Sequence, residues 1–248
     1  MSTARAAVND ALPPPTSTRL IECSEVARTY RSGTAAVVAV RAVSCSVGPG
    51  DRIAIMGPSG SGKSTLLHLM AGLDQPTTGT IRWPALQDVP HRSTAIGVVF
   101  QGPSLIPSLT AAENAALPLL LAGVAESEAI TRATEAMAVL DIDDLANKLP
   151  EELSGGQAQR VAVARVLASA PSVILADEPT GQLDHEAGGR LISALLTAAH
   201  RSGAALAVAT HDPAVAERFD MRWQMNDGLL GTTRRSPAGD PTDSDIAR

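Results

Sequence analysis

The chain has 248 residues, of which 44% are hydrophobic and 19% are charged, and this balance is typical of a folded globular protein rather than a disordered one. The formal net charge is -6 at pH 7 and no long run of Lys and Arg occurs, so the sequence argues against a nucleic-acid partner. Cys23 and Cys45 have no metal-binding spacing, and we expect them to be reduced thiols.

The two ends of the chain differ in composition from the part between them. Residues 1–18 and 232–248 are small, polar and proline-rich without a periodic apolar pattern, so we predict that both are disordered. Residues 19–231 are predicted to form one folded domain. The most apolar stretch, residues 115–125, is shorter than the ~20 residues that span a bilayer. We therefore expect that the chain does not cross a membrane by itself.

Short apolar runs alternate with helical patterns along the predicted domain. The predicted strands are residues 52–56, 95–100, 173–176 and 205–209, and the clearest helices are residues 65–71 and 158–168. Continuous apolar strands separated by helices indicate an α/β fold with a mostly parallel sheet. Residues 104–168 contain no strand-like run, so we predict a helical subdomain there, inserted between strands.

A glycine-rich segment joins the strand at 52–56 to the helix at 65–71. It matches the pattern G-x-x-x-x-G-K-[ST] in full, with Gly57, Pro58, Ser59, Gly60, Ser61, Gly62, Lys63, Ser64 and Thr65. Glycines let the backbone approach a phosphate group closely, and the loop N–H groups attract the anion together with the positive end of the helix. Lys63 is expected to reach the β- and γ-phosphates and Ser64 to offer a hydroxyl to Mg²⁺. By itself the motif predicts nucleotide binding without choosing among GTPases, kinases, transporters and helicases.

Two acidic residues follow the apolar run at 173–176. In an open α/β sheet, ligands collect at the carboxyl ends of the strands, where these two side chains would lie. Asp177 is therefore expected to bind Mg²⁺, directly or through a water molecule. Glu178 is the candidate general base, or the group that orients the attacking water.

Residues 153–157 read Leu-Ser-Gly-Gly-Gln and precede the predicted helix at 158–168. Ser154 and Gln157 have the spacing of a capping box, in which each side chain bonds the backbone of the other residue. This spacing places Ser154, Gly155 and Gly156 at an exposed helix N-terminus, where an anion can bind.

With these motifs together, the chain resembles the ATP-binding subunits of ABC transporters from about residue 20 to residue 231. The resemblance also covers Gln101 after a Val-Val-Phe run and the segments Gly-Gln-Leu-Asp at 181–184 and Thr-His-Asp at 210–212. It implies a P-loop NTPase core, a small N-terminal antiparallel β-subdomain and an inserted helical subdomain, with ATP and Mg²⁺ as ligands.

The resemblance also implies roles for residues that no local pattern explains. Gln101 would take part in catalysis, sensing Mg²⁺ and the membrane partner, and His211 would contact the γ-phosphate. Asp184 would lie at the interface between two subunits. Tyr30, the only tyrosine, matches the aromatic residue that stacks on adenine. The alternative for Tyr30 is a packing residue at a strand end.

The family further implies an assembly. Two copies would pair head to tail, so that each ATP lies between the P-loop of one subunit and the residues Ser154, Gly155, Gly156 and Gln157 of the other. ATP binding would close this homodimer and hydrolysis would open it. The dimer would drive a separate integral membrane permease from the cytoplasmic face of the cell membrane, as a peripheral subunit.

A finer resemblance concerns one branch of the family. The segments 72–79 and 109–114 and the Leu-Pro-Leu at 117–119 are similar to those of the branch that serves macrolide exporters and lipoprotein-release complexes. Two features depart from that branch. The stretch 79–101 is shorter than expected, which predicts a trimmed β-hairpin, and Gln182 stands where Asn or Ser is more usual.

Other members of the superfamily provide the competing hypotheses. DNA-repair and chromosome ATPases carry a long coiled coil between the P-loop and residue 154, and this chain has no heptad run there. Translation factors carry two ATPase units, whereas this chain has one. A catalytically inactive regulator is disfavoured by intact Lys63, Asp177, Glu178 and His211. A scaffold or regulator of cell-envelope enzymes, acting without transport, shares every motif and stays open.

Overall fold

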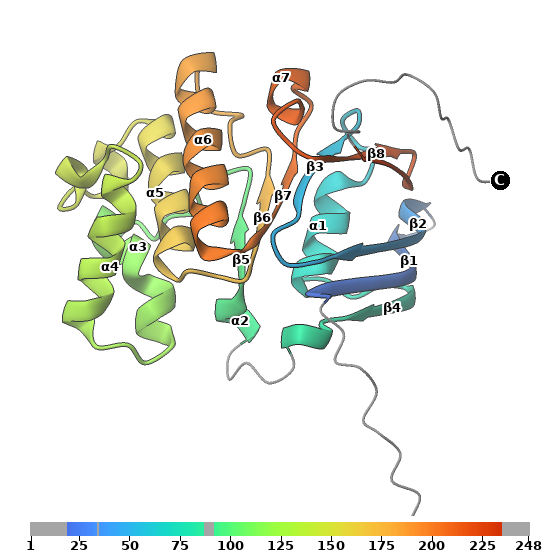
Figure 1. Ribbon diagram of the computed structural model, residues 1–248, viewed down its shortest axis with the longest axis horizontal. Helices are drawn as coiled ribbons and strands as arrows, with labels where there is room; N and C mark the ends of the chain where they lie inside the picture. The colour runs from blue at the N-terminus through green and yellow to red at the C-terminus, as the bar shows by residue number, and fades with distance from the viewer. Residues whose placement is uncertain (1–18, 34, 87–91, 235–248) are drawn as a thin grey trace, which may run out of the picture.

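The computed structural model describes residues 19–33, 35–86 and 92–234, and it has a six-stranded sheet with helices on both faces and a smaller sheet beside it (Figure 1). The segments 1–18 and 235–248, in which disorder was predicted, lie outside the described residues. The last strand continues to Arg234, three residues into the segment that the sequence assigned to the tail.

The larger sheet confirms the predicted parallel arrangement. Its strands lie in the order β5 (Ile96–Val99), β6 (Val173–Asp177), β7 (Ala205–Ala209), β3 (Arg52–Met56), β8 (Met221–Asn226) and β9 (Leu229–Arg234). The first five strands are parallel, and β9 returns antiparallel to β8. Every residue of β6 and β7 is buried, because both faces of the sheet are covered.

Successive residues of the central strands belong to two different cores. Ala54 and Val208 pack in the core under the helices at one face, whereas Ile53 and Ala207 pack in the core shared with α1 and the smaller sheet. Each fully buried Ile or Leu side chain contributes roughly 1.5–3 kcal/mol. Each continuous apolar run in the sequence therefore contributes buried side chains to the cores on both faces of the sheet.

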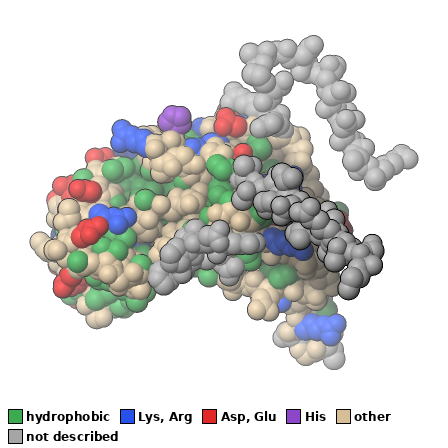
Figure 2. All heavy atoms as spheres, turned by 60° about the horizontal axis from the view of Figure 1, so that its bottom comes forward, with side chains coloured by type: hydrophobic (Ala, Val, Ile, Leu, Met, Phe, Trp, Pro, Cys, Tyr) green, Lys and Arg blue, Asp and Glu red, His purple; other side chains and the backbone are tan. Residues whose placement is uncertain are grey.

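The helices lie on both sides of the larger sheet (Figure 1). They are α1 (Lys63–Ala71), α2 (Arg92–Ala95), α3 (Ala111–Leu121), α4 (Glu126–Ala138), α5 (Gly155–Ala168), α6 (His185–Ser202) and α7 (Pro213–Ala216). Helices α3, α4 and α5 pack together and form the inserted helical subdomain that the family resemblance implied. Their contacts are rich in alanine, which allows close approach. Acidic side chains are frequent on this end of the molecule (left in Figure 2).

The smaller sheet confirms the expected antiparallel β-subdomain. It has the order β2 (Ala35–Val47), β1 (Ile21–Ser32) and β4 (Thr78–Arg82), and irregular register occurs between β1 and both neighbours. Cys23 and Cys45 face each other across β1 and β2 as free thiols. The stretch 79–101, in which we predicted a trimmed hairpin, begins in β4 and ends after β5, and residues 87–91 within it lie outside the described residues.

Some predicted boundaries differ from the observed ones for local reasons. The helix predicted at 65–71 begins at Lys63, directly after Gly62, whose φ of 101° is readily adopted by glycine and rarely by other residues. The strand predicted at 95–100 is β5, and Ala95 belongs instead to the short helix α2. In the described part of the chain, none of the helices has the length and apolar character that crossing a membrane requires.

The loop between β5 and α3 is fastened to the helical subdomain. Asn114 of α3 is fully buried, and its side chain accepts a hydrogen bond from the Ile106 N–H at 2.8 Å and donates to the carbonyl of Leu109 at 2.9 Å. Arg165 of α5 donates to the carbonyl of Pro103 at 3.1 Å. The loop is therefore held in one shape by side chains of α3 and α5.

This network predicts a stability change. Asn114→Ala removes the buried hydrogen bonds and leaves an N–H and several carbonyl groups of the loop without partners, so we expect the free energy of unfolding to fall by about 2–4 kcal/mol in urea denaturation. Asn147→Ala is the matched control, because Asn147 is exposed, and its effect should stay within about 0.5 kcal/mol. Equal stability of the two variants would show that the Asn114 network does not hold the loop.

Candidate functional site

The glycine-rich loop after β3 is fixed by two glycines that touch the backbone of other strands. A Cβ atom on Gly57 would lie 2.1 Å from the Met225 carbonyl oxygen in β8, and one on Gly62 would lie 2.1 Å from the Ala39 carbonyl oxygen in β2. Both residues also have positive φ, 152° and 101°. Any larger residue would push these strands away, so the loop is held between the two sheets only because both positions are glycine.

Lys63 is the first residue of α1 and lies behind this loop. Its side chain is buried, and its Nζ donates hydrogen bonds to the carbonyl oxygens of Gly57 at 2.8 Å and Pro58 at 3.1 Å. These two hydrogen bonds hold the ammonium group against the backbone of the glycine-rich loop. It lines a cleft that the loop borders.

The cleft has a volume of about 600 Å³ and gathers residues from distant parts of the sequence. Its lining consists of Ala39, Ser59, Gly60, Gly62, Lys63, Ser64, Thr65, Gln101, Glu178, Gly181 and His211. The charged and polar members follow the carboxyl ends of β3, β5, β6 and β7, which are parallel and therefore end at the same edge. The structure thus brings together the four residues that the motifs and the family resemblance predicted to take part in catalysis, namely Lys63, Gln101, Glu178 and His211.

The two acids after β6 have different surroundings. Asp177 is 5% exposed, and its Oδ1 has no hydrogen-bond partner among the described residues. Glu178 has a left-handed φ of 46°, and its N–H donates to the Ala209 carbonyl at 3.0 Å. Its Oε2 lies 2.9 Å from Nδ1 of His211. A left-handed φ is uncommon for a non-glycine residue and costs about 1–3 kcal/mol.

The side chains of Ser64, Gln101 and Asp177 carry the oxygen atoms that a divalent cation such as Mg²⁺ requires. Mg²⁺ prefers oxygen ligands, and a buried carboxylate oxygen without a partner is costly unless a cation or an ordered water completes its bonding. Asp177 offers such an oxygen, while Ser64 and Gln101 line the cleft with a hydroxyl and an amide.

The segment with Ser154 lies outside the lining of this cleft. The N–H of Gln157 donates to Oγ of Ser154 at 3.3 Å and the Ser154 N–H donates to Oε1 of Gln157 at 2.8 Å, which confirms the predicted capping box at the start of α5. Ser154 and Gly155 are exposed. A Cβ on Gly156 would lie 2.7 Å from the Leu183 side chain, so this helix start packs against the loop that precedes α6.

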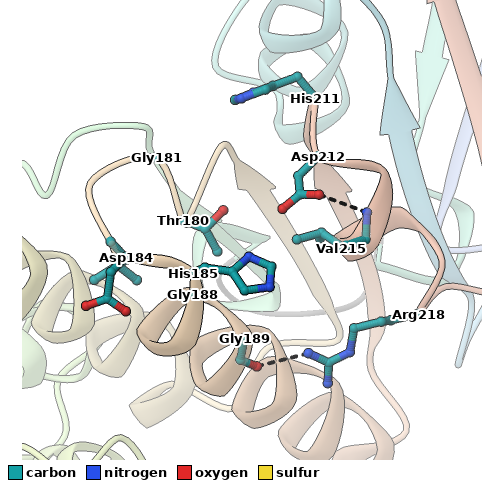
Figure 3. Close-up of a pocket in the computed structure, with 12 residues that line it drawn as sticks. Thr180, Gly181, Asp184, His185, Gly188, Gly189, His211, Asp212, Val215 and Arg218 are labelled. Atoms are coloured by element: carbon teal, nitrogen blue, oxygen red, sulfur yellow. Dashed lines mark hydrogen bonds between the residues drawn. The ribbon is translucent and has the colours of Figure 1, made fainter.

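A second cavity of about 430 Å³ adjoins the cleft and shares Gly181 and His211 with it. Asp184 caps the N-terminus of α6 at one side of this cavity. In Figure 3 the side chains of His185 and His211 lie apart, although both residues line the cavity. Arg218 lies at the far side and donates a hydrogen bond to a carbonyl of α6.

Tyr30 is not part of the cleft lining. It lies in β1 with 41% of its surface exposed, and its hydroxyl donates to Oδ2 of Asp74 at 2.8 Å. Sequence reasoning missed this partner, and it also missed Ala39 and Gly181 as residues of the cleft. Ala39 lies there because its carbonyl oxygen packs against Gly62 of the glycine-rich loop. No local sequence pattern reveals this contact between the two sheets.

Comparison with known proteins identifies the family. The family described as ABC transporter matches residues 40–181. The ATP-binding protein LolD of a lipoprotein-releasing system from Legionella pneumophila strain Lens is 38% identical over 219 residues, covering 85% of this chain and 96% of the relative. The same protein from strain Paris is 39% identical over the same shares.

Solved structures agree with this result. A dimeric post-hydrolysis state of the ATP-binding cassette MJ0796 bound to ADP and Pi has a TM-score of 0.79 and 36% identity, covering 86% of this chain and 98% of its own. CbiO1 from Clostridium perfringens, part of the ABC transporter complex cbiONQ, has a TM-score of 0.74 and 27% identity, covering 88% of this chain and 89% of its own. The chain therefore belongs to the ABC transporter family, as an ATPase subunit of the branch that includes the lipoprotein-release proteins.

Proposed function

We propose that this chain binds ATP with Mg²⁺ in the cleft described above, hydrolyses it, and thereby drives a separate membrane permease. The observation that carries the proposal is the meeting of Lys63, Gln101, Glu178 and His211 in one cleft beside the glycine-rich loop. ADP is bound by the related cassette MJ0796, and the relatives from Legionella are ATP-binding proteins of lipoprotein-releasing systems.

The loop and Lys63 would hold the phosphates. The backbone N–H groups of Gly60 to Thr65 and the N-terminal end of α1 attract negative charge. The Lys63 ammonium is already oriented by two carbonyl oxygens, so it would lose little conformational freedom when it contacts the β- and γ-phosphates.

Glu178 would act on the attacking water. Its side chain is mostly buried, its backbone is tied to β7, and His211 lies within hydrogen-bond distance of its carboxylate. A carboxylate fixed in this way can accept a proton from water or orient it toward the γ-phosphate. His211 is three-quarters exposed, so its ring can turn from Glu178 toward the phosphate.

The cleft would hold Mg²⁺ together with ATP, and the cation would supply positive charge that offsets the charge of the phosphates. Ser64, Gln101 and Asp177 are the residues that would hold it, directly or through water. The burial of Asp177 keeps its carboxylate in a fixed place at the end of β6.

A second copy would complete the nucleotide site. Ser154 and Gly155 are exposed at the start of α5 and, like Gly156, lie outside the lining of this chain's own cleft. This supports the proposal that the three residues bind the ATP of a partner in a head-to-tail homodimer. Asp184 would lie at the interface. The related MJ0796 cassette is dimeric.

The permease would dock near the loop from Gln101 to Thr110. Ile106 in this loop is 38% exposed although it is a large hydrophobic residue, and the loop shape is fixed by Asn114 and Arg165. The chain would work as a peripheral subunit at the cytoplasmic face of the membrane.

The role of Glu178 predicts a separation of binding from hydrolysis. Glu178→Gln keeps the size of the side chain but cannot accept a proton, so we expect ATP affinity to persist while turnover falls by about 10²–10⁴-fold. The variant should also accumulate as a dimer with ATP in size-exclusion chromatography with light scattering. Glu186→Gln is the control, because Glu186 is exposed on α6 outside the cleft. Unchanged turnover in Glu178→Gln would remove Glu178 from the mechanism.

The role of Lys63 predicts a loss of nucleotide affinity. Lys63→Ala removes a charged donor, and a hydrogen bond to a charged group contributes roughly 1.5–3 kcal/mol, so the Kd for ATP should rise at least about tenfold in isothermal titration. Lys148→Ala, a change at an exposed lysine, should leave the Kd unchanged. The assignment fails when both variants bind ATP as the unsubstituted protein does.

The transport role is tested by recovery of a partner. Tagged Glu178→Gln protein is used to capture partners from detergent-solubilised host membranes, with and without MgATP, and these are identified by mass spectrometry. We expect a polytopic membrane protein to co-elute in a manner that depends on the loop around Ile106, so that Ile106→Asp reduces its recovery. Recovery of soluble proteins alone would contradict the transport role while leaving the ATP chemistry in place.

A further inference from the structure

Arg28, Tyr30 and Asp74 form a closed set of three contacts. The Tyr30 hydroxyl donates to Oδ2 of Asp74 at 2.8 Å, and Nη2 of Arg28 lies 2.8 Å from Oδ1 of the same carboxylate. The Arg28 guanidinium also lies over the Tyr30 ring, 4.7 Å from its centroid. The Asp74 carboxylate therefore binds both the Tyr30 hydroxyl and the Arg28 guanidinium. The guanidinium in turn covers one face of the Tyr30 ring.

The Tyr30 ring lies close to the cleft that Lys63 and Ala39 line. Tyr30 pairs with Val37 of β2 in the antiparallel register, and the two side chains of such a pair lie on the same face of a sheet. Val37 is 64% exposed, so this face presents apolar surface to solvent. Ala39, two residues further along β2, lines the cleft. The exposed pair thus lies beside the edge of the cleft that β2 forms.

We propose that Arg28 and Asp74 are positioning residues that hold the Tyr30 ring as a stacking surface for the adenine base of ATP. This inference rests on the proposed function, because it requires ATP in the cleft. An aromatic ring has two faces, and the guanidinium covers one of them. The base would stack on the other face, with Val37 beside it.

The charges of the cluster favour this arrangement. The positive charge of Arg28 is balanced by the Asp74 carboxylate. The guanidinium also lies over the Tyr30 ring, where a cation–π contact stabilises it. Burial acts to raise the pKa of Asp74, but the hydrogen bonds from Tyr30 and the Gln75 N–H and the charge of Arg28 together lower that pKa below its usual value. Asp74 therefore stays ionised at neutral pH, and the contacts would be lost only in acid, as the pH falls through this lowered pKa.

The loop that carries Asp74 joins this cluster to the phosphate end of the site. Asp74 comes three residues after the end of α1, and α1 begins at Lys63 of the glycine-rich loop. One helix therefore carries a group for the phosphates at its start and the support for the stacking ring just beyond its end. The length of α1 would therefore set the spacing between the two groups.

The experiment separates base recognition from phosphate binding. Tyr30→Phe keeps the ring and removes the hydroxyl, Asp74→Asn keeps the shape and removes the charge, and Arg28→Gln removes the cation over the ring. Each is expected to raise the Kd for MgATP by about three- to tenfold while the affinity for inorganic tripolyphosphate and kcat at saturating ATP stay unchanged. The double variant of Tyr30→Phe and Asp74→Asn should lose less affinity than the two single losses combined, because the Tyr30–Asp74 contact is affected by both changes.

Two controls make the outcome specific. Glu22→Gln is a matched change in the same strand, where Glu22 contacts Arg19, and it should leave every Kd unchanged. Asp74→Glu retains the charge and should recover part of the affinity that Asp74→Asn loses.

Failure of this inference differs from failure of the proposed function. A weakened Kd in Tyr30→Ala together with unchanged values in Tyr30→Phe, Asp74→Asn and Arg28→Gln would overturn the positioning role and leave adenine stacking intact. Equal losses for ATP and tripolyphosphate would also overturn it, because they indicate general damage to the site. An unsubstituted protein that does not bind MgATP would contradict the proposed function, and the positioning role with it.

Discussion

The site depends on one constraint, the parallel alignment of the strands that carry its residues. Because β3, β5, β6 and β7 run in the same direction, their carboxyl ends meet at one edge of the sheet. The glycine-rich loop, Gln101, Glu178 and His211 each follow one of these ends. The chemistry is assembled from short segments that are far apart in sequence, and the hydrophobic burial of the strands between the two cores supplies the free energy that keeps them together.

A second constraint joins the two sheets. The loop that would hold the phosphates touches the backbone of β2 through Gly62 and of β8 through Gly57, at distances that leave no space for a Cβ atom. The smaller sheet is therefore part of the structure that forms the cleft. Its strand β2 forms one wall of the cleft at Ala39, and its strand β1 carries Tyr30 nearby. The glycine-rich loop and the strand that carries Tyr30 therefore belong to different sheets, which meet at the Gly62 contact and at the hydrogen bond from the Arg41 N–H to the Gly228 carbonyl.

Much of the fold and of the site could be predicted from the sequence because the signals are local. The P-loop is a strand, a turn and a helix in one continuous segment, and the capping box at Ser154 and Gln157 is likewise contained in a few residues. The apolar runs identify the parallel strands because both sheet faces are buried. Contacts between distant segments could not be predicted. The irregular register of β1 decides which side chains face Tyr30, and neither the Asp74 contact nor the place of Ala39 follows from periodicity. The strained backbone of Glu178 also depends on its hydrogen bond to β7, which the sequence does not reveal.

The loop that begins at Gln101 has a mechanical property that follows from its fastening. Asn114 and Arg165 hold it, and the buried side chain of Gln159 donates to the Phe100 carbonyl at 3.2 Å where the loop leaves β5. All three residues belong to α3 and α5. A force applied to the loop from outside would therefore be transmitted to α3 and α5 through these hydrogen bonds. The exposed helix start at Ser154 caps α5, so in the proposed dimer a push on this loop would reach the segment that would contact a second copy.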